Sequence, residues 1–169
     1  MIRRFALISS LITLGAIAIT SKADAQEVNI DYNAKIDPSC TVGNVTNGKL
    51  VLWDTDDSIM DANPLKATGA QPGSFELNCS GGAEISFGTP VAQNGSPTIE
   101  LKRTELFDGD PSTGGSLLAD VYNGGTNLAD LTGPIFNKTL YVAMAVNNGG
   151  TPLPPGDYNY RVTLNITAK

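Results

Sequence analysis

The feature that most constrains this chain is an alternating segment at its carboxyl end. Polar residues there separate a row of apolar and aromatic ones: Tyr158, Tyr160, Val162, Leu164, Ile166 and Ala168. A period of two predicts a β-strand with one buried face. Eleven residues at about 3.3 Å each reach roughly 36 Å, which is long for a strand and predicts one that crosses a whole domain.

A second alternating segment lies near the amino end, and shorter apolar runs lie between the two. The amino-terminal segment has Val28, Ile30, Tyr32, Ala34 and Ile36 on one face and Asn29, Asp31, Asn33 and Lys35 on the other. Further strands are expected at 49–53, 73–79, 83–87, 98–101, 117–122 and 139–146. Turns rich in glycine, proline and asparagine separate these runs, and no segment has helical periodicity. The pattern predicts an all-β fold, an antiparallel β-sandwich.

The first 25 residues have the features of a signal peptide. Arg3 and Arg4 form a basic start, residues 5–20 are mainly apolar, and Ala23 and Ala25 occupy the small-residue positions of a cleavage site. A membrane anchor would need about 20 strongly apolar residues, and this run is shorter and diluted by serine and threonine. Cleavage after Ala25 leaves 144 residues, which is room for one domain.

The mature chain is acidic and has no histidine. Without Arg3, Arg4, Lys22 and Asp24 it has 8 basic and 16 acidic residues, a net charge of −8. Nucleic acid is therefore a disfavoured partner. The absence of histidine removes the commonest general base and zinc ligand, so we expect no catalytic residues, metal or cofactor. Segment 54–61 contains four aspartates but lacks the glycine of a calcium loop, and we expect a solvated acidic loop or short helical turn.

Two cysteines, Cys40 and Cys79, remain after cleavage. In an exported protein an isolated pair predicts one disulfide, which would stabilise the fold by roughly 4 kcal/mol in the chain-entropy model. Cys79 shares the parity of Phe75 and Leu77, so its sulfur is expected to point into the core.

With these features together, the chain resembles a chaperone-usher pilus subunit, most like the archaic-type subunits grouped with spore coat protein U. The resemblance rests on the alternating segment 28–36, Cys40 followed by Thr41 and Val42, the second cysteine in FELNCSGG, and a terminal strand with Gly156 fourteenth from the end. The chain departs from the family at its penultimate residue, which is Ala168 where pilus subunits commonly have an aromatic.

This resemblance implies an immunoglobulin-like sandwich that lacks its final strand. Residues 26–37 would be an N-terminal extension and residues 38–169 the pilin-like domain. The extension would donate a strand to a neighbouring subunit through Val28, Ile30, Tyr32, Ala34 and Ile36. The acceptor edge, which would also bind the chaperone, would be Gly156, Tyr158, Tyr160, Val162, Leu164, Ile166 and Ala168.

The function implied by the resemblance is structural. A periplasmic chaperone would lend the missing strand, and at an outer-membrane usher the next subunit's extension would replace it. The product would be a pilus, or fimbria, on the cell surface that supports adhesion and biofilm formation.

Alternation alone fits a second interpretation equally well. The two end segments would then be outer strands of a self-complete sandwich, a secreted binding module for ligands such as glycans. Trp53, the only tryptophan, ends an apolar run and is expected in the core, not at a glycan site. An enzyme is disfavoured because the chain also has no GxSxG motif.

Overall fold

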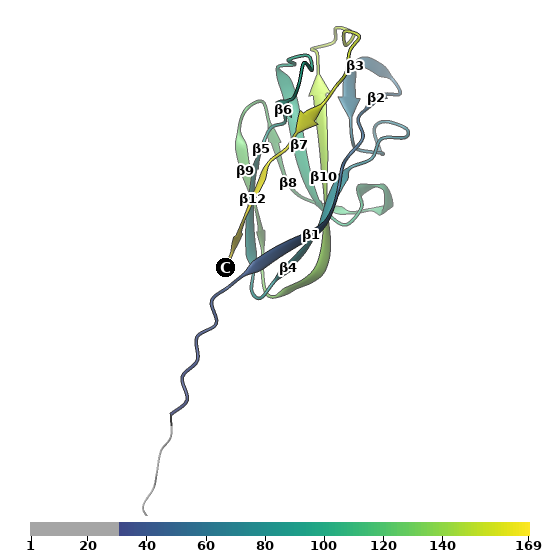
Figure 1. Cartoon of the computed structure of the whole chain (residues 1–169). Helices are drawn as coiled ribbons and strands as arrows, with labels where there is room; N and C mark the ends of the chain where they lie inside the picture. Colours follow the sequence, from purple (N-terminus) through teal and green to yellow (C-terminus); the bar gives the residue numbers. More distant parts are fainter. Residues whose placement is uncertain (1–30) are drawn as a thin grey trace, which may run out of the picture. The chain divides into compact units, whose positions relative to one another are not determined.

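A computed structural model describes residues 31–169, which divide between Lys35 and Ile36 into two units. The described part of the first unit, residues 31–35, is exposed and lies in no helix or strand. The expected signal peptide, Val28 and Ile30 lie outside the described residues. The second unit contains all the strands labelled in Figure 1.

The described chain is almost entirely β-structure, as expected. Its only helix is a short 3-10 turn, η1 (Pro111–Thr113). The strands are β1 (Cys40–Thr46), β2 (Val51–Trp53), β3 (Asp56–Asp61), β4 (Gly73–Cys79), β5 (Ala83–Gly88), β6 (Val91–Ala92), β7 (Leu101–Asp108), β8 (Ser116–Tyr122), β9 (Thr126–Leu131), β10 (Ile135–Asn147), β11 (Tyr160–Arg161) and β12 (Leu164–Ala168).

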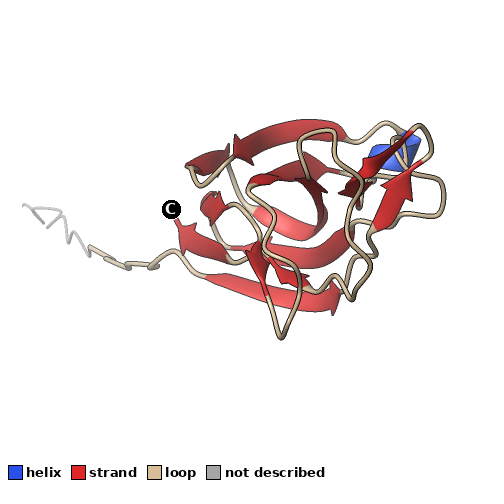
Figure 2. Ribbon diagram, turned by 90° about the horizontal axis from the view of Figure 1, so that it is seen from above, coloured by secondary structure: helices blue, strands red, loops and turns tan. Residues whose placement is uncertain are grey.

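The strands form two main sheets, and all pairings are antiparallel. The larger sheet has the order β1-β4-β10-β3-β2, and β7 and β8 extend it from the other side of β10. The smaller sheet has the order β12-β5-β9, and β11 pairs separately with β6. Seen from above, the strands surround a common interior (Figure 2). The predicted antiparallel sandwich is confirmed.

The main core lies between these sheets. Leu77, Leu106 and Leu140 of the larger sheet and Ile85 and Phe87 of the smaller one are at most 2% exposed and belong to one cluster. In β4 and β5 every second residue is buried, which is the pattern that predicted both strands. The central strands of each sheet therefore have their apolar faces covered by the other sheet.

The predicted disulfide is present. Cys40 of β1 and Cys79 of β4 are directly paired across the sheet and bonded through sulfur, with their Cα atoms 4.1 Å apart. Cys79 is buried in the core, as its parity predicted. A structural disulfide indicates an oxidising compartment outside the cytosol. Among the described residues, no helix is long and apolar enough to span a bilayer.

The interpretation of segment 54–61 as a solvated loop or helical turn was wrong. Asp56–Asp61 form β3, which pairs with β2 on one side and β10 on the other. Asp61 is only 1% exposed. A carboxylate tolerates this position because Trp53, Asn63 and Lys66 surround it with donors. Those partners lie within eight residues of Asp61, but the pattern of residues does not show that they surround its carboxylate.

Other strands, among them β7 and β9, were misplaced or missed. The run expected at 98–101 lies mostly before β7, which shares only Leu101 with it. β7 does not alternate simply, because Arg103 and Glu105 are held in ion pairs with Asp120 and Lys66. β9 was not recognised, since its leucines, asparagine and aspartate do not form a continuous apolar run.

Candidate functional site

The carboxyl-terminal segment consists of two strands, so the prediction of one continuous strand was wrong. β11 pairs with β6, β12 pairs with β5, and Val162 and Thr163 lie between them outside either strand. The cause is in the facing chain, where Thr89 and Pro90 separate β5 from β6 and proline has no N–H for a ladder bond. The alternation of the side chains continues through the break.

The inward face of this segment is incompletely covered. Its even-numbered residues are all half-buried and its odd-numbered residues from Asn159 to Thr167 are all exposed. By comparison, Phe75, Leu77 and Cys79 on β4 are at most 5% exposed. A row of apolar side chains that is only half-buried indicates a missing layer of atoms above it.

A groove of about 630 Å³ runs along the same row. Its floor contains Ala62, Phe75, Val142 and Met144. One wall is the carboxyl-terminal segment, through Tyr158, Tyr160, Val162 and Leu164, with the polar Asn159 and Arg161 between them. The opposite wall is the end of β1 and the chain after it, through Val45, Thr46, Asn47, Gly48 and Leu50. Most of the floor and of the carboxyl-terminal wall is therefore apolar.

Both walls include a sheet edge. Among the described residues, β1 pairs only with β4 and β12 only with β5. The backbone N–H of Lys169 bonds to Gly82, and the carbonyl of Asn159 accepts from Gln93, so odd-numbered residues bond toward β5 and β6. Alternation in an antiparallel ladder then directs the N–H and C=O groups of the even-numbered residues toward the groove. Two sheet edges that are unpaired among the described residues therefore lie on either side of the groove floor.

Close backbone contact supports the β1 wall. Lys49 and Gln71 exchange two backbone hydrogen bonds of 2.7 and 3.1 Å. At Gly48 a Cβ atom would lie 2.8 Å from the Gly73 nitrogen and 3.0 Å from the Gln71 oxygen. Only glycine fits this approach without displacing backbone. The wall is thus held by the chain that precedes β4.

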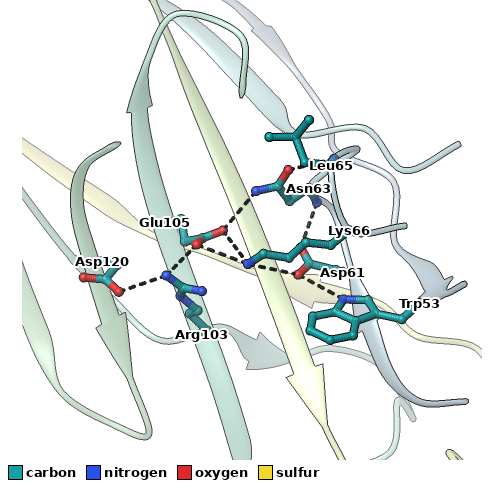
Figure 3. Close-up of polar contacts among 8 residues, drawn as sticks. All are labelled: Trp53, Asp61, Asn63, Leu65, Lys66, Arg103, Glu105 and Asp120. Carbon is teal, nitrogen blue, oxygen red and sulfur yellow. Dashed lines mark hydrogen bonds and ion pairs between the residues drawn. The ribbon is translucent and has the colours of Figure 1, made fainter. Parts of the chain in front are cut away.

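A buried polar cluster anchors that same stretch of chain (Figure 3). The Lys66 ammonium lies 3.3 Å from Glu105 and 3.6 Å from Asp61. Asp61 accepts from the Asn63 backbone at 2.7 Å and from the Trp53 indole at 3.3 Å. Burial raises the pKa of Asp61 above its usual value, although these hydrogen bonds and Lys66 oppose the shift.

The cluster connects the floor of the groove to its wall. The loop that Lys66 anchors begins after Ala62 in the floor and ends at Gln71 beside the wall. The contacts of Lys66 with Asp61 and Glu105 hold that loop in place. Trp53, expected in the core, is half-buried at the edge of this cluster. Within residues 31–169 no group of three His, Cys, Asp or Glu side chains is arranged to hold a metal ion.

Two tyrosines fix the end of the groove farthest from the carboxyl terminus. The hydroxyl of Tyr158 donates to the Pro154 carbonyl, and that of Tyr160 donates to the Pro97 carbonyl. Burial raises the pKa of both phenols, which keeps them protonated as donors at neutral pH. The loops that contain Pro154 and Pro97 are therefore tied to the carboxyl-terminal wall of the groove.

The structure unites part of the proposed site and separates the rest. Of the expected acceptor residues, Tyr158, Tyr160, Val162 and Leu164 line the groove, Ile166 and Ala168 lie beyond its lining in β12, and Gly156 is exposed before it. Of the expected donor residues, Tyr32, Ala34 and Ile36 are exposed and in no strand. The β1 wall and the floor were not recognised, because they come from segments far apart in sequence.

A scan against models of known protein families finds no match to the chain, and a search of curated proteins finds no significantly similar sequence.

Proposed function

We propose that this chain is a structural subunit of an extracellular pilus, assembled when the amino-terminal segment of one copy fills the groove of the next. The observation that carries this proposal is a groove that contains a row of apolar and aromatic side chains and lies between two sheet edges that are unpaired among the described residues. A self-complete binding module would have no such slot. The chain has a matching occupant, since segment 28–36 has five alternating apolar or aromatic residues.

The dimensions and energetics of the two parts agree. The groove wall from Tyr158 to Leu164 spans seven residues, roughly 23 Å, and segment 28–36 extends to about 30 Å. Burying four or five apolar side chains at about 1.5–3 kcal/mol each favours binding by roughly 10 kcal/mol before the cost of ordering the segment. Backbone hydrogen bonds to the two edges add directionality.

The direction of the inserted strand follows from where β1 begins. Both views place the carboxyl terminus beside the start of β1, at the opposite end of β12 from Tyr158 (Figures 1 and 2). A neighbour's segment that runs antiparallel to β12 leaves the groove at the Tyr158 end, so each domain follows the last head to tail. Parallel insertion would crowd the neighbour against the acceptor's own β1 and stop growth.

An open groove of this kind needs a temporary cover before assembly. Val42 is 50% exposed and Val45 70% exposed on β1, next to a free sheet edge, a combination that favours aggregation. A periplasmic chaperone that lends a strand, followed by transfer at an outer-membrane usher, would meet this need. The disulfide and the signal-like leader fit passage through the periplasm.

The proposal is tested with a chain that can accept a strand but cannot donate one. In the full mature chain, Ile30→Asp and Tyr32→Asp place charges on the apolar face of the donor segment. We expect the wild-type chain to form multimers on size-exclusion chromatography and this double variant, the acceptor variant, to remain monomeric. A synthetic peptide of residues 26–37 should bind the acceptor variant and raise its melting temperature.

The same peptide with Ile30→Asp and Tyr32→Asp is the matched control and should not bind. Failure of the wild-type peptide to bind a folded acceptor variant would contradict the proposal. Multimers of normal yield from the acceptor variant itself would contradict it equally.

A further inference from the structure

We propose that two cross-strand ion pairs, Asp31 with Arg161 and Lys35 with Asp157, set the register of the inserted segment. This inference rests on the proposed function, since it concerns how one copy's segment lies in another copy's groove. It names the residues that select one alignment among several that bury the same number of apolar side chains.

Parity limits the possible registers. The even-numbered residues of the carboxyl-terminal wall are half-buried and its odd-numbered residues exposed, and the apolar residues of segment 28–36 are also even-numbered. Even positions must therefore face even positions, and the antiparallel segment can slide only in steps of two residues. Apolar burial alone distinguishes such steps weakly, because each step places another apolar residue in the groove.

The outward row of the acceptor carries little charge. From residue 157 to residue 167 its odd-numbered members are Asp157, Asn159, Arg161, Thr163, Asn165 and Thr167, all exposed. Arg161 and Asp157 are the charged ones, and neither has an ion-pair partner among the described residues. Two opposite charges four residues apart thus lie on the rim of the groove.

The donor segment has the complementary spacing. Asp31 and Lys35 are also exposed, four residues apart, on its polar face. Because antiparallel strands run in opposite directions, the alignment that places Asp31 opposite Arg161 also places Lys35 opposite Asp157. One register therefore satisfies both pairs.

Neighbouring registers lose both pairs or oppose like charges. A shift of two residues places Asp31 opposite Asn159 in one direction and Thr163 in the other. A shift of four places Asp31 opposite Asp157 in one direction, and Lys35 opposite Arg161 in the other. Like charges directly opposite each other are destabilising, so electrostatics favours the central alignment over all four neighbours.

Backbone geometry strengthens the two pairs. The even-numbered acceptor residues direct their backbone groups into the groove, so the odd-numbered positions form the pairs without mutual hydrogen bonds. Side chains are closer in such pairs, with Cα atoms about 4.5 Å apart. Both ion pairs therefore occupy the tighter positions of the ladder.

The same alignment is consistent with side-chain size. It places Ala34 opposite Tyr158, whose ring is held by its hydrogen bond to Pro154, and Ile36 opposite Gly156. A small side chain then meets a large fixed one, and a large side chain meets a glycine. Tyr32 and Ile30 fall opposite Tyr160 and Val162, in the lined part of the groove.

A charge-reversal cycle tests the register. The acceptor variant is prepared with and without Arg161→Asp, and the 26–37 peptide with and without Asp31→Arg. We expect either reversal alone to raise the peptide dissociation constant by about three- to tenfold, and the two together to restore it. The Lys35→Asp and Asp157→Lys cycle should behave in the same way.

In the full chain, the Asp31→Arg variant and the Arg161→Asp variant should each assemble slowly. An equimolar mixture of the two should assemble at nearly the wild-type rate. In the mixture, the donor segment of each variant meets an opposite charge in the groove of the other. Glu100→Arg, which makes the same charge change as Asp31→Arg at an exposed position outside the groove lining, is the control and should assemble normally. Melting temperatures should match the wild type in all of these variants.

The outcomes separate this inference from the proposed function. Wild-type peptide that does not bind would contradict the proposed function. Wild-type peptide that binds, with single reversals that bind equally well or a double reversal no better than the singles, would overturn the register alone. At about 1 M salt the differences should shrink, because exposed charges are then screened.

Discussion

The two lateral sides of the sandwich are built differently. On one side β8 and β9 follow each other in the chain and join the two sheets through a tight turn at Asn123 and Gly124, both with positive φ. The side-chain amide of Asn127 donates to the Asp120 carbonyl, so part of the strand edge there is satisfied. Val121 and Leu131 beneath it are buried. On this side the chain itself joins the two sheets, although β8 pairs only with β7 and β9 only with β5.

On the other side β1 and β12 are the first and last strands, so no short turn can join them. Every β1 residue from Thr41 to Thr46 is exposed, and the facing even-numbered residues of the carboxyl-terminal segment are only half-buried. The comparison teaches that a hairpin within the chain can join the two sheets, whereas the two ends of the chain leave a groove between β1 and the carboxyl-terminal segment.

The largest expected effect comes from the bond that holds β1 to the body of the fold. Replacing both Cys40 and Cys79 by serine removes a cross-link between residues 39 apart, which should cost about 4 kcal/mol of the free energy of unfolding. Chemical denaturation of the wild type with and without reductant, beside the double variant, measures this. Equal midpoints for all three would show that β1 is held without the bridge.

Core truncations should differ between the two sides. Ile85→Ala at a fully buried position should cost about 2–5 kcal/mol, and Leu164→Ala at the half-buried wall about 1 kcal/mol. Adding the 26–37 peptide should increase the cost of Leu164→Ala, because the leucine would then become buried, and leave that of Ile85→Ala unchanged. Denaturation curves with and without peptide give the comparison, and equal costs at both positions would contradict an open side.

A single methyl group should disturb the β1 wall. Gly48→Ala places a Cβ against backbone atoms of Gly73 and Gln71 and should cost about 1–3 kcal/mol. Gly43→Ala is the matched control in β1, before the residues that line the groove, since a Cβ there meets nothing within 4 Å. Peptide affinity should fall in the first variant and hold in the second. Wild-type affinity in both would exclude this contact as a support of the groove.

The smallest effect concerns pH. The pKa of Asp61 is raised in the folded state, so the folded chain retains its proton at pH values where the unfolded chain has lost it. Stability contributed by this group is therefore lost as pH rises from the unfolded pKa through the folded one. Asp61→Asn should remove that loss, and its stability relative to wild type should increase from acid to neutral pH. Thermal melts across this range test the sign.

Sequence alone was sufficient where one segment carries its own signal. The alternation in β4, β5 and β10 and the parity of Cys79 are local properties, and each predicted its element or direction. β7 was misjudged because ion pairs to Asp120 and Lys66, which lie far away in the sequence, compensate Arg103 and Glu105. The charge of Asp61 hid β3, because the pattern of residues does not show that Trp53, Asn63 and Lys66 surround its carboxylate with donors.

The candidate site divides in the same way. Periodicity by itself determined which carboxyl-terminal residues face inward, because a strand turns successive side chains to opposite faces. Only the tertiary structure decided that their cover is incomplete, that the acceptor edge breaks opposite Pro90, and that Val45 to Leu50 form the other wall. Coverage and edge pairing depend on where distant segments pack, and that arrangement is a property of the whole fold.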